Sequence, residues 1–382
     1  MGMLSSCSLP VMRKLFSLLV LLPLTLLAQP QVRVESMPEA GIQPQVIVST
    51  SGVVHLIYLL GDPKACDIRY TTRRLEGGAW SPPITVNSEP GSAIAMGTIR
   101  GAQIALGKSD SVQVIWNGST AGKKERMMRA PLLHARLQTG SKAFSAQQDL
   151  MGDTTALDGG ASIAANDQGH VRVIWHAAPA GTQGENSRLV YVRSSNDDGL
   201  SFSVPQPLNQ QKPGVCACCS LRAHLAADGT LSVLYRGAPE PMSRGMVLLM
   251  HEAGQSTLTP LDDWRAAICP MSSASLLPAS SSLRAAWEND GRIVLSQLAV
   301  PGSSVRKIGP KNAKHPALAL NTRQQLLIAS VIGSGWNKAG TLHWELLDHD
   351  GKVTSSGDGG KLPLWSFAAA YACPDGSFVI LH

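Results

Sequence analysis

A recurring stretch of alternating apolar residues that ends in an aromatic residue dominates this sequence. Each copy begins with a small or turn-forming residue, and the terminal aromatics are Tyr58, Trp116, Trp175, Tyr235 and Trp287. Alternation with a period of two is typical of a β-strand. Self-similarity at a period of roughly 50 residues indicates stacked supersecondary units rather than one continuous sheet. The chain is therefore expected to be a series of similar β-units.

Further strand-like segments surround the aromatic stretch in each copy. A shorter apolar run precedes it across an Asp, Asn or Gly turn, and two short runs follow, as at residues 188–193 and after Phe202. Four antiparallel strands per copy, without a long amphipathic helix, predict the blade of a β-propeller. We count seven copies. The prediction is an all-β, six- or seven-bladed propeller with seven blades favoured, and two β-sandwiches are the alternative.

The seventh copy holds only two strands, and the N-terminal region offers a strand to complete it. Residues 31–35 resemble the fourth strand of another copy, residues 84–87. Pairing of the two chain ends would close the ring and remove its open edges. We therefore expect residues 29–382 to form one domain that is closed by N- and C-terminal strands.

Residues 1–28 have the pattern of an export signal. Arg13 and Lys14 precede a mostly apolar run at residues 15–28, which is shorter than the roughly 20 residues that span a bilayer. Cleavage would follow Ala28. We expect a secreted or periplasmic protein without a transmembrane segment, and an uncleaved membrane anchor is the alternative.

Charge excludes one class of partner. The chain has 33 Lys and Arg against 27 Asp and Glu, a formal net charge of +6, and no long basic run. Nucleic-acid binding needs a concentrated positive stripe. We expect no nucleic-acid partner, and we expect a monomer.

Six cysteines remain when Cys7 leaves with the signal, an even number that suggests disulfides in an exported chain. Five of them map to one face of the predicted propeller: Cys66, Cys216, Cys218, Cys219 and Cys269. One interpretation is a set of disulfides between loops, for instance from Cys269 to one residue of the 216–219 group. The other is a soft-metal or redox site aided by Met271 and His251. No other cofactor is expected.

One turn follows a more specific pattern, S-x-D-x-G-x-[ST]-[WF]. It is occupied by Ser195, Asp197, Gly199 and Phe202. In such a turn the carboxylate accepts backbone N–H bonds, and glycine adopts a positive φ. Together with the repeat, this Asp-box resembles the sialidase-type (BNR repeat) β-propeller superfamily over essentially the whole mature chain. The Cys-Ala-Cys-Cys segment also resembles secreted sialidase-like bacterial proteins.

The resemblance implies a propeller, but two elements of sialidase chemistry are missing. That mechanism uses three arginines on the substrate carboxylate, a Tyr/Glu nucleophile pair and an Asp acid/base. The first blade lacks the expected Arg-Ile-Pro, and Phe367 stands where the family has its nucleophilic tyrosine. We therefore do not expect sialoside hydrolysis.

Four polar residues that follow the repeat aromatics are the candidate ligand site: Asn117, His176, Arg236 and Glu288. The repeat places them at equivalent positions, which we expect to lie at the mouth of the central channel. Arg236 could clamp a carboxylate or phosphate, and Glu288 is the candidate catalytic carboxylate. The favoured hypothesis is binding of a glycan or another small exported ligand. The alternatives are a glycoside hydrolase and a metal or redox site, and ordinary loop residues are the plainer interpretation of each position.

Overall fold

The computed structural model describes residues 1–3, 31–121, 130–155, 157–279, 282–298 and 305–382. The chain separates into two units, Met1–Pro30 and Gln31–His382. The predicted export signal and Cys7 lie almost entirely outside the described residues. Among the helices that are described, none is long and apolar enough to cross a membrane.

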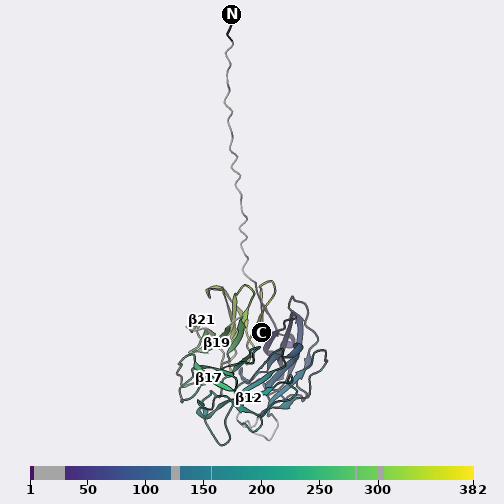
Figure 1. The fold of residues 1–382 in the computed structure, drawn as a ribbon, viewed down its shortest axis with the longest axis vertical. Helices are drawn as coiled ribbons and strands as arrows, with labels where there is room; N and C mark the ends of the chain where they lie inside the picture. Colours follow the sequence, from purple (N-terminus) through teal and green to yellow (C-terminus); the bar gives the residue numbers. More distant parts are fainter. Residues whose placement is uncertain (4–30, 122–129, 156, 280–281, 299–304) are drawn as a thin grey trace. The chain divides into compact units, whose positions relative to one another are not determined.

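The unit Gln31–His382 is built from small β-sheets, which are blades arranged around a centre (Figure 1). Six blades have four antiparallel strands in sequence order. The first three contain β2 (Ile42–Val48), β3 (Val53–Asp62), β4 (Ala65–Arg74) and β5 (Ile84–Thr85); β6 (Gln103–Leu106), β7 (Val112–Asn117), β8 (Leu132–Leu137) and β9 (Gln148–Asp149); and β10 (Ser162–Ala165), β11 (Val171–Ala177), β12 (Leu189–Ser195) and β13 (Gln206–Pro207).

The next three blades have the same arrangement. They contain β14 (Arg222–Leu225), β15 (Leu231–Arg236), β16 (Met246–Glu252) and β17 (Gln255–Pro260); β18 (Ser275–Ala279), β19 (Ser282–Asn289), β20 (Arg292–Leu298) and β21 (Arg306–Ile308); and β22 (Ala313–Leu320), β23 (Leu326–Ile332), β24 (Thr341–Leu347) and β25 (Val353–Lys361). Short 3-10 turns interrupt the loops at η1 (Pro38–Ala40), η2 (Lys108–Asp110) and η4 (Glu185–Ser187).

The seventh blade differs from the others. It has three strands in the order β26 (Ala369–Ala372), β27 (Phe378–Leu381) and β1 (Val32–Glu35), and β1 pairs parallel to β27. In a four-stranded antiparallel blade, the second and fourth strands run in the same direction with the third strand between them. The strand β1 runs in the direction of a fourth strand but pairs directly with β27, the second strand. The two neighbours are therefore parallel. The sequence therefore identified the strand but not its position in the blade.

The ring is closed through its innermost strands. Each inner strand contacts the inner strand of the next blade, and β26 contacts β2. The prediction of a seven-bladed propeller is thus confirmed. We call the face on which the inner strands begin the loop face, and it also carries the hairpins between second and third strands.

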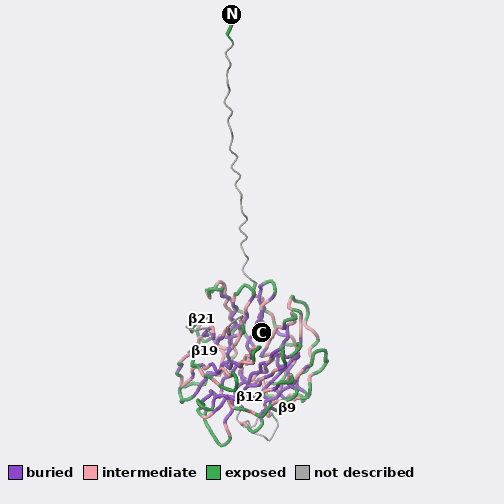
Figure 2. Tube along the Cα trace, in the orientation of Figure 1, coloured by how far each residue is buried: buried purple, intermediate pink, exposed green. Residues whose placement is uncertain are grey.

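The repeat aromatics form the core between the blades. Tyr58, Trp116, Trp175, Tyr235 and Trp287 are at most 2% exposed. Each second strand is covered on both sides by neighbouring blades, so both sets of its alternating side chains are buried. All six residues of β7 are buried in this way. Figure 2 accordingly shows buried segments throughout the ring rather than in one central cluster.

Candidate functional site

A central channel runs between the seven inner strands and has a volume of about 610 Å³. Its lining is mostly apolar, and Arg222 and His224 on β14 are among its few polar residues. Burial lowers the pKa of Arg222 to about 10, so the guanidinium is still charged at neutral pH. The sequence analysis did not single out this channel-lining cation.

A short segment of the second blade, residues 97–100, closes the loop-face end of this channel; we call it the cap segment. The Thr98 hydroxyl lies 3.0 Å from Nε2 of His315, which is in the sixth blade and lines the channel. Gly97 packs against Trp336, also in the sixth blade. The second and sixth blades lie on nearly opposite sides of a seven-membered ring, so the segment must cross the axis.

Contacts to the first and third blades hold the cap segment in place. The Gln43 amide nitrogen donates to the Ala95 carbonyl just before the cap segment (2.6 Å) and lies 3.5 Å from the Gly97 carbonyl oxygen within it. Gly160 packs so tightly that a Cβ there would lie 1.9 Å from the Ile99 carbonyl oxygen. The ligand pocket expected at the mouth of the channel is therefore filled by the chain itself.

A smaller pocket of about 200 Å³ opens beside the cap segment on the loop face. Lys64, Arg100 and Asp158 supply its charges, and Met96 and Leu157 supply apolar surface. The Arg100 guanidinium donates to both the backbone carbonyl and the carboxylate of Asp158. This ion pair joins the second and third blades across one wall of the pocket.

Asn117, which was expected at the mouth of the central channel, lines this side pocket instead. Its amide nitrogen donates to the Gly159 carbonyl at 3.1 Å. Its Oδ1 atom is buried and has no hydrogen-bond partner among the described residues. An unpartnered buried acceptor is costly.

The other three predicted site residues are buried instead of facing a pocket mouth. His176 accepts at Nδ1 from Arg188 (2.9 Å), and its Nε2–H donates to the Cys219 carbonyl at 3.1 Å. Burial, together with the nearby Arg188 charge, lowers the pKa of His176 to about 3. The imidazole is therefore neutral and positions a cysteine-containing loop rather than a ligand.

Arg236 and Glu288 form a buried pair. Arg236 donates to the Arg244 and Glu288 carbonyls, both at 2.6 Å, and its guanidinium lies 3.9 Å from the Glu288 carboxylate. The Glu288 carboxylate also accepts from the Gly291 N–H at 3.2 Å. Both side chains are at most 3% exposed. The two side chains are therefore buried rather than at the open channel mouth that was expected, and their roles as anion clamp and catalytic carboxylate stay predictions.

The predicted cysteine group is only partly assembled. Cys218 and Cys269 form a disulfide, whereas Cys216 and Cys219 are free thiols beside it. Cys66 is a separate buried thiol on β4 that packs in a different cluster. Met271 packs against the 216–219 group, but His251 lies on β16 and hydrogen-bonds Ser256. A loop-to-loop disulfide is thus present, and two thiols remain next to it.

The turn at residues 195–202 has the geometry expected of its sequence. The Asp197 carboxylate accepts from the Ser195 hydroxyl (2.7 Å) and the Ser201 N–H (2.9 Å), and Gly199 has a φ of 80°. These hydrogen bonds lower the pKa of Asp197 to about 2. Phe202 packs edge-on against His134 of the second blade.

The neighbouring Asp198 has a role that sequence reasoning missed. Its carboxylate accepts from the Lys108 N–H and from Ser111, both at 2.9 Å, and pairs with Arg136 at 2.8 Å. All three partners lie in the second blade, so this turn links two blades. The sequence pattern of this turn allows any residue at position 198, so it gives no signal for a link between blades.

Comparison with known proteins supports the fold. No family model and no curated protein matches the chain. Among solved structures, an α-L-arabinanase of Penicillium chrysogenum in complex with arabinobiose is 12% identical, covers 84% of this chain and 98% of its own, and has a TM-score of 0.55. A protein of unknown function from Dyadobacter fermentans DSM 18053 is 13% identical, covers 77% and 90%, and has a TM-score of 0.52. At these identities the likeness is one of fold alone, and it agrees with the β-propeller described above.

Proposed function

We propose that this protein is an exported binding propeller that takes one sugar residue, or a polar molecule of similar size, in the pocket beside the cap segment. The observation that carries the proposal is the pocket itself, where the charges of Lys64, Arg100 and Asp158 lie beside apolar surface. A volume of about 200 Å³ is below the roughly 300–1,000 Å³ typical of drug-sized ligands. The ligand is therefore small, or only its terminal residue enters.

The pocket chemistry suits a polyhydroxylated ligand. Hydroxyl groups both donate and accept, so they can donate to Asp158 and accept from Lys64 and Arg100. Met96 and Leu157 give apolar surface for the C–H face of a sugar ring. The excess of basic groups also favours a ligand that carries a carboxylate or sulfate.

Hydrolysis is the less favoured function. Most glycosidases place two carboxyl groups on either side of the scissile bond, about 5 to 9.5 Å apart. Asp158 is the one carboxylate among the described lining residues, and it is paired with Arg100. Glu288 is buried beneath Arg236, and the position of the family nucleophile is occupied by Phe367, which is buried at the start of the seventh blade.

Two observations support the proposal that the protein is exported. Residues 1–28 have the pattern of a cleaved signal, and Cys218 is bonded to Cys269. Disulfides persist in oxidising compartments and are rare in the cytosol. We therefore place the mature protein outside the cytoplasm.

Binding to a glycan array, followed by calorimetry with each hit, tests the proposal. Lys64 is exposed, so Lys64→Ala should keep the fold and weaken binding about tenfold, the effect of losing one charged hydrogen bond. Arg265→Ala, in an exposed ion pair with Glu240 outside the pocket, is the matched control. Equal affinity of the Lys64 and Arg265 variants would exclude this pocket.

Turnover separates the binder from the hydrolase. We expect no release of product from aryl glycosides, including sialosides, at any pH where the protein is folded. Turnover that Glu288→Gln abolishes in a folded protein would overturn the binding proposal in favour of hydrolysis.

A further inference from the structure

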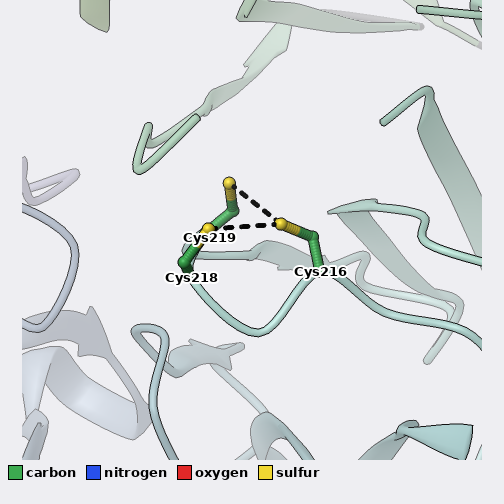
Figure 3. A group of neighbouring side chains, drawn as sticks. All are labelled: Cys216, Cys218 and Cys219. Atoms are coloured by element: carbon green, nitrogen blue, oxygen red, sulfur yellow. Dashed lines mark hydrogen bonds between the residues drawn. The ribbon is translucent and has the colours of Figure 1, made fainter. Parts of the chain in front are cut away.

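Three cysteine sulfurs gather over one tight loop of the loop face, residues 215–220, which we call the cysteine loop (Figure 3). The Sγ atom of Cys216 lies 3.5 Å from that of Cys218 and 3.6 Å from that of Cys219. A fourth sulfur, from Cys269, is bonded to Cys218. Four sulfurs from two blades thus share one location.

These separations match those of a metal–thiolate centre. A metal–sulfur bond of about 2.3 Å with tetrahedral angles places two ligand sulfurs about 3.8 Å apart. The two thiol contacts of Cys216 are within a few tenths of an ångström of that value. No large movement of the cysteine loop is needed to surround one ion.

The backbone of the cysteine loop is held before any ion binds. The Cys216 N–H donates to the Arg236 carbonyl at 2.9 Å, and the Ala217 N–H donates to the Glu185 carboxylate at 2.7 Å. The Cys219 carbonyl accepts from His176 at 3.1 Å. The residues expected to bind a ligand at the channel mouth therefore fix the geometry of this loop.

We propose that Cys216, Cys218, Cys219 and Cys269 form a binding site for one Cu(I) ion when the Cys218–Cys269 disulfide is reduced. The site is independent of the pocket beside the cap segment. In the oxidised protein the disulfide occupies two of the four donors, so binding is coupled to the redox state.

The reduction step requires an external dithiol. One thiolate of the dithiol attacks a sulfur of the disulfide, which frees one cysteine and leaves a mixed disulfide with the other; the second thiolate then attacks the mixed disulfide and frees the other cysteine. Two electrons and two protons pass to Cys218 and Cys269, and the dithiol becomes a disulfide. Cys269 is exposed, so this bond can be reached from solvent. Cu(I) then replaces the protons of the ligating thiols.

The donor set favours Cu(I) over harder ions. All four donors are thiols, and the thioether residue Met271 packs against them; soft sulfur ligands select Cu(I) among the first-row metals, with Zn(II) the main competitor. The Arg236 charge repels a divalent ion more strongly than a monovalent one. Cys216 and Cys219 are also buried, which protects a bound Cu(I) from solvent.

Anaerobic titration of the mature protein with Cu(I), in competition with a chromogenic chelator, tests the proposal. We expect the dithiol-reduced protein to bind one ion per chain and the oxidised protein to bind at least 100-fold more weakly. Near-ultraviolet circular dichroism before titration checks that the reduced protein stays folded. An unfolded reduced state, or equal binding in the two redox states, would overturn the proposal.

Variants assign the ligands. Cys216→Ser and Cys219→Ser leave the disulfide intact and should each weaken Cu(I) binding by the reduced protein on the order of 100-fold, at least the loss seen for metal-supporting residues. Cys373→Ala, at a buried free thiol remote in sequence, should bind as the wild type does. Equal losses in all three variants, or binding of Zn(II) without Cu(I), would contradict the site.

Discussion

The two sides of the loop face are closed in different ways. On one side the cap segment crosses the channel and is held by hydrogen bonds and by the Arg100–Asp158 pair, which is partly exposed. On the other side the cysteine loop is held by a disulfide and by a buried Arg236–Glu288 pair. The contacts on the first side are partly open to solvent, whereas on the second side the disulfide can be reduced and the ion pair is buried.

The largest expected effect comes from the buried pair on the cysteine side. Arg236→Ala removes the donors to two carbonyls and leaves the Glu288 carboxylate buried without its counter-charge. Breaking such a pair costs about 3–5 kcal/mol. Urea unfolding measures the loss, and Arg265→Ala is the exposed control, with little expected change. A loss below about 1 kcal/mol would remove the proposed difference between the two sides.

Loss of the disulfide is expected to be the next largest effect. Cys269→Ser opens a link between residues 51 positions apart, and removing such a link costs about 2–4 kcal/mol. The variant and the wild type should unfold at the same urea concentration once a reductant is present. If the two proteins still unfold at different urea concentrations in reductant, the effect of the serine does not come from the lost disulfide.

On the cap side, Gly160→Ala should cost about 1–3 kcal/mol through overpacking. The new methyl group would lie 1.9 Å from the Ile99 carbonyl oxygen, so the cap segment has to move. Gly335→Ala is the matched control, because its nearest neighbour lies 3.7 Å away. If both variants unfold alike, the cap segment is looser than its contacts indicate.

Acid should affect both sides alike, through one histidine each. Burial lowers the pKa values of His176 and His315 to about 3, aided by Arg188 in the first case and by Lys314 and Arg222 in the second. Below pH 6.5 these histidines are protonated in the unfolded state but stay neutral in the folded state. The free energy of unfolding therefore falls as the pH drops from 6.5 towards 3. The loss is about 1.4 kcal/mol per pH unit for each histidine.

Substitution of either histidine tests that symmetry. His315→Gln and His176→Gln should each reduce the stability difference between pH 6.5 and 5.5 by about 1 kcal/mol, measured by urea unfolding at both pH values. An unchanged slope in one variant would show that its histidine takes up a proton without unfolding.

The features that the sequence predicted correctly are those that depend on local sequence pattern. The repeat aromatics and the 195–202 turn depend on neighbours within one blade, and the structure has them as expected. The candidate site depended on where each second strand ends. His176, Arg236 and Glu288 follow the aromatics but are still within β11, β15 and β19, where neighbouring blades bury them. The channel mouth is crossed instead by residues 97–100, whose Thr98 reaches His315. No local pattern reports such a crossing.

The parallel pairing of β1 with β27 has a consequence for biogenesis. Val32 lies opposite Phe378, so β1 has no partner until β27, far along the chain, has been made. Contacts between such distant residues slow folding, and an unpaired strand edge can recruit another chain. Residues 32–35 are therefore the segment at which a chaperone would most reduce pairing with other chains while the rest of the ring assembles.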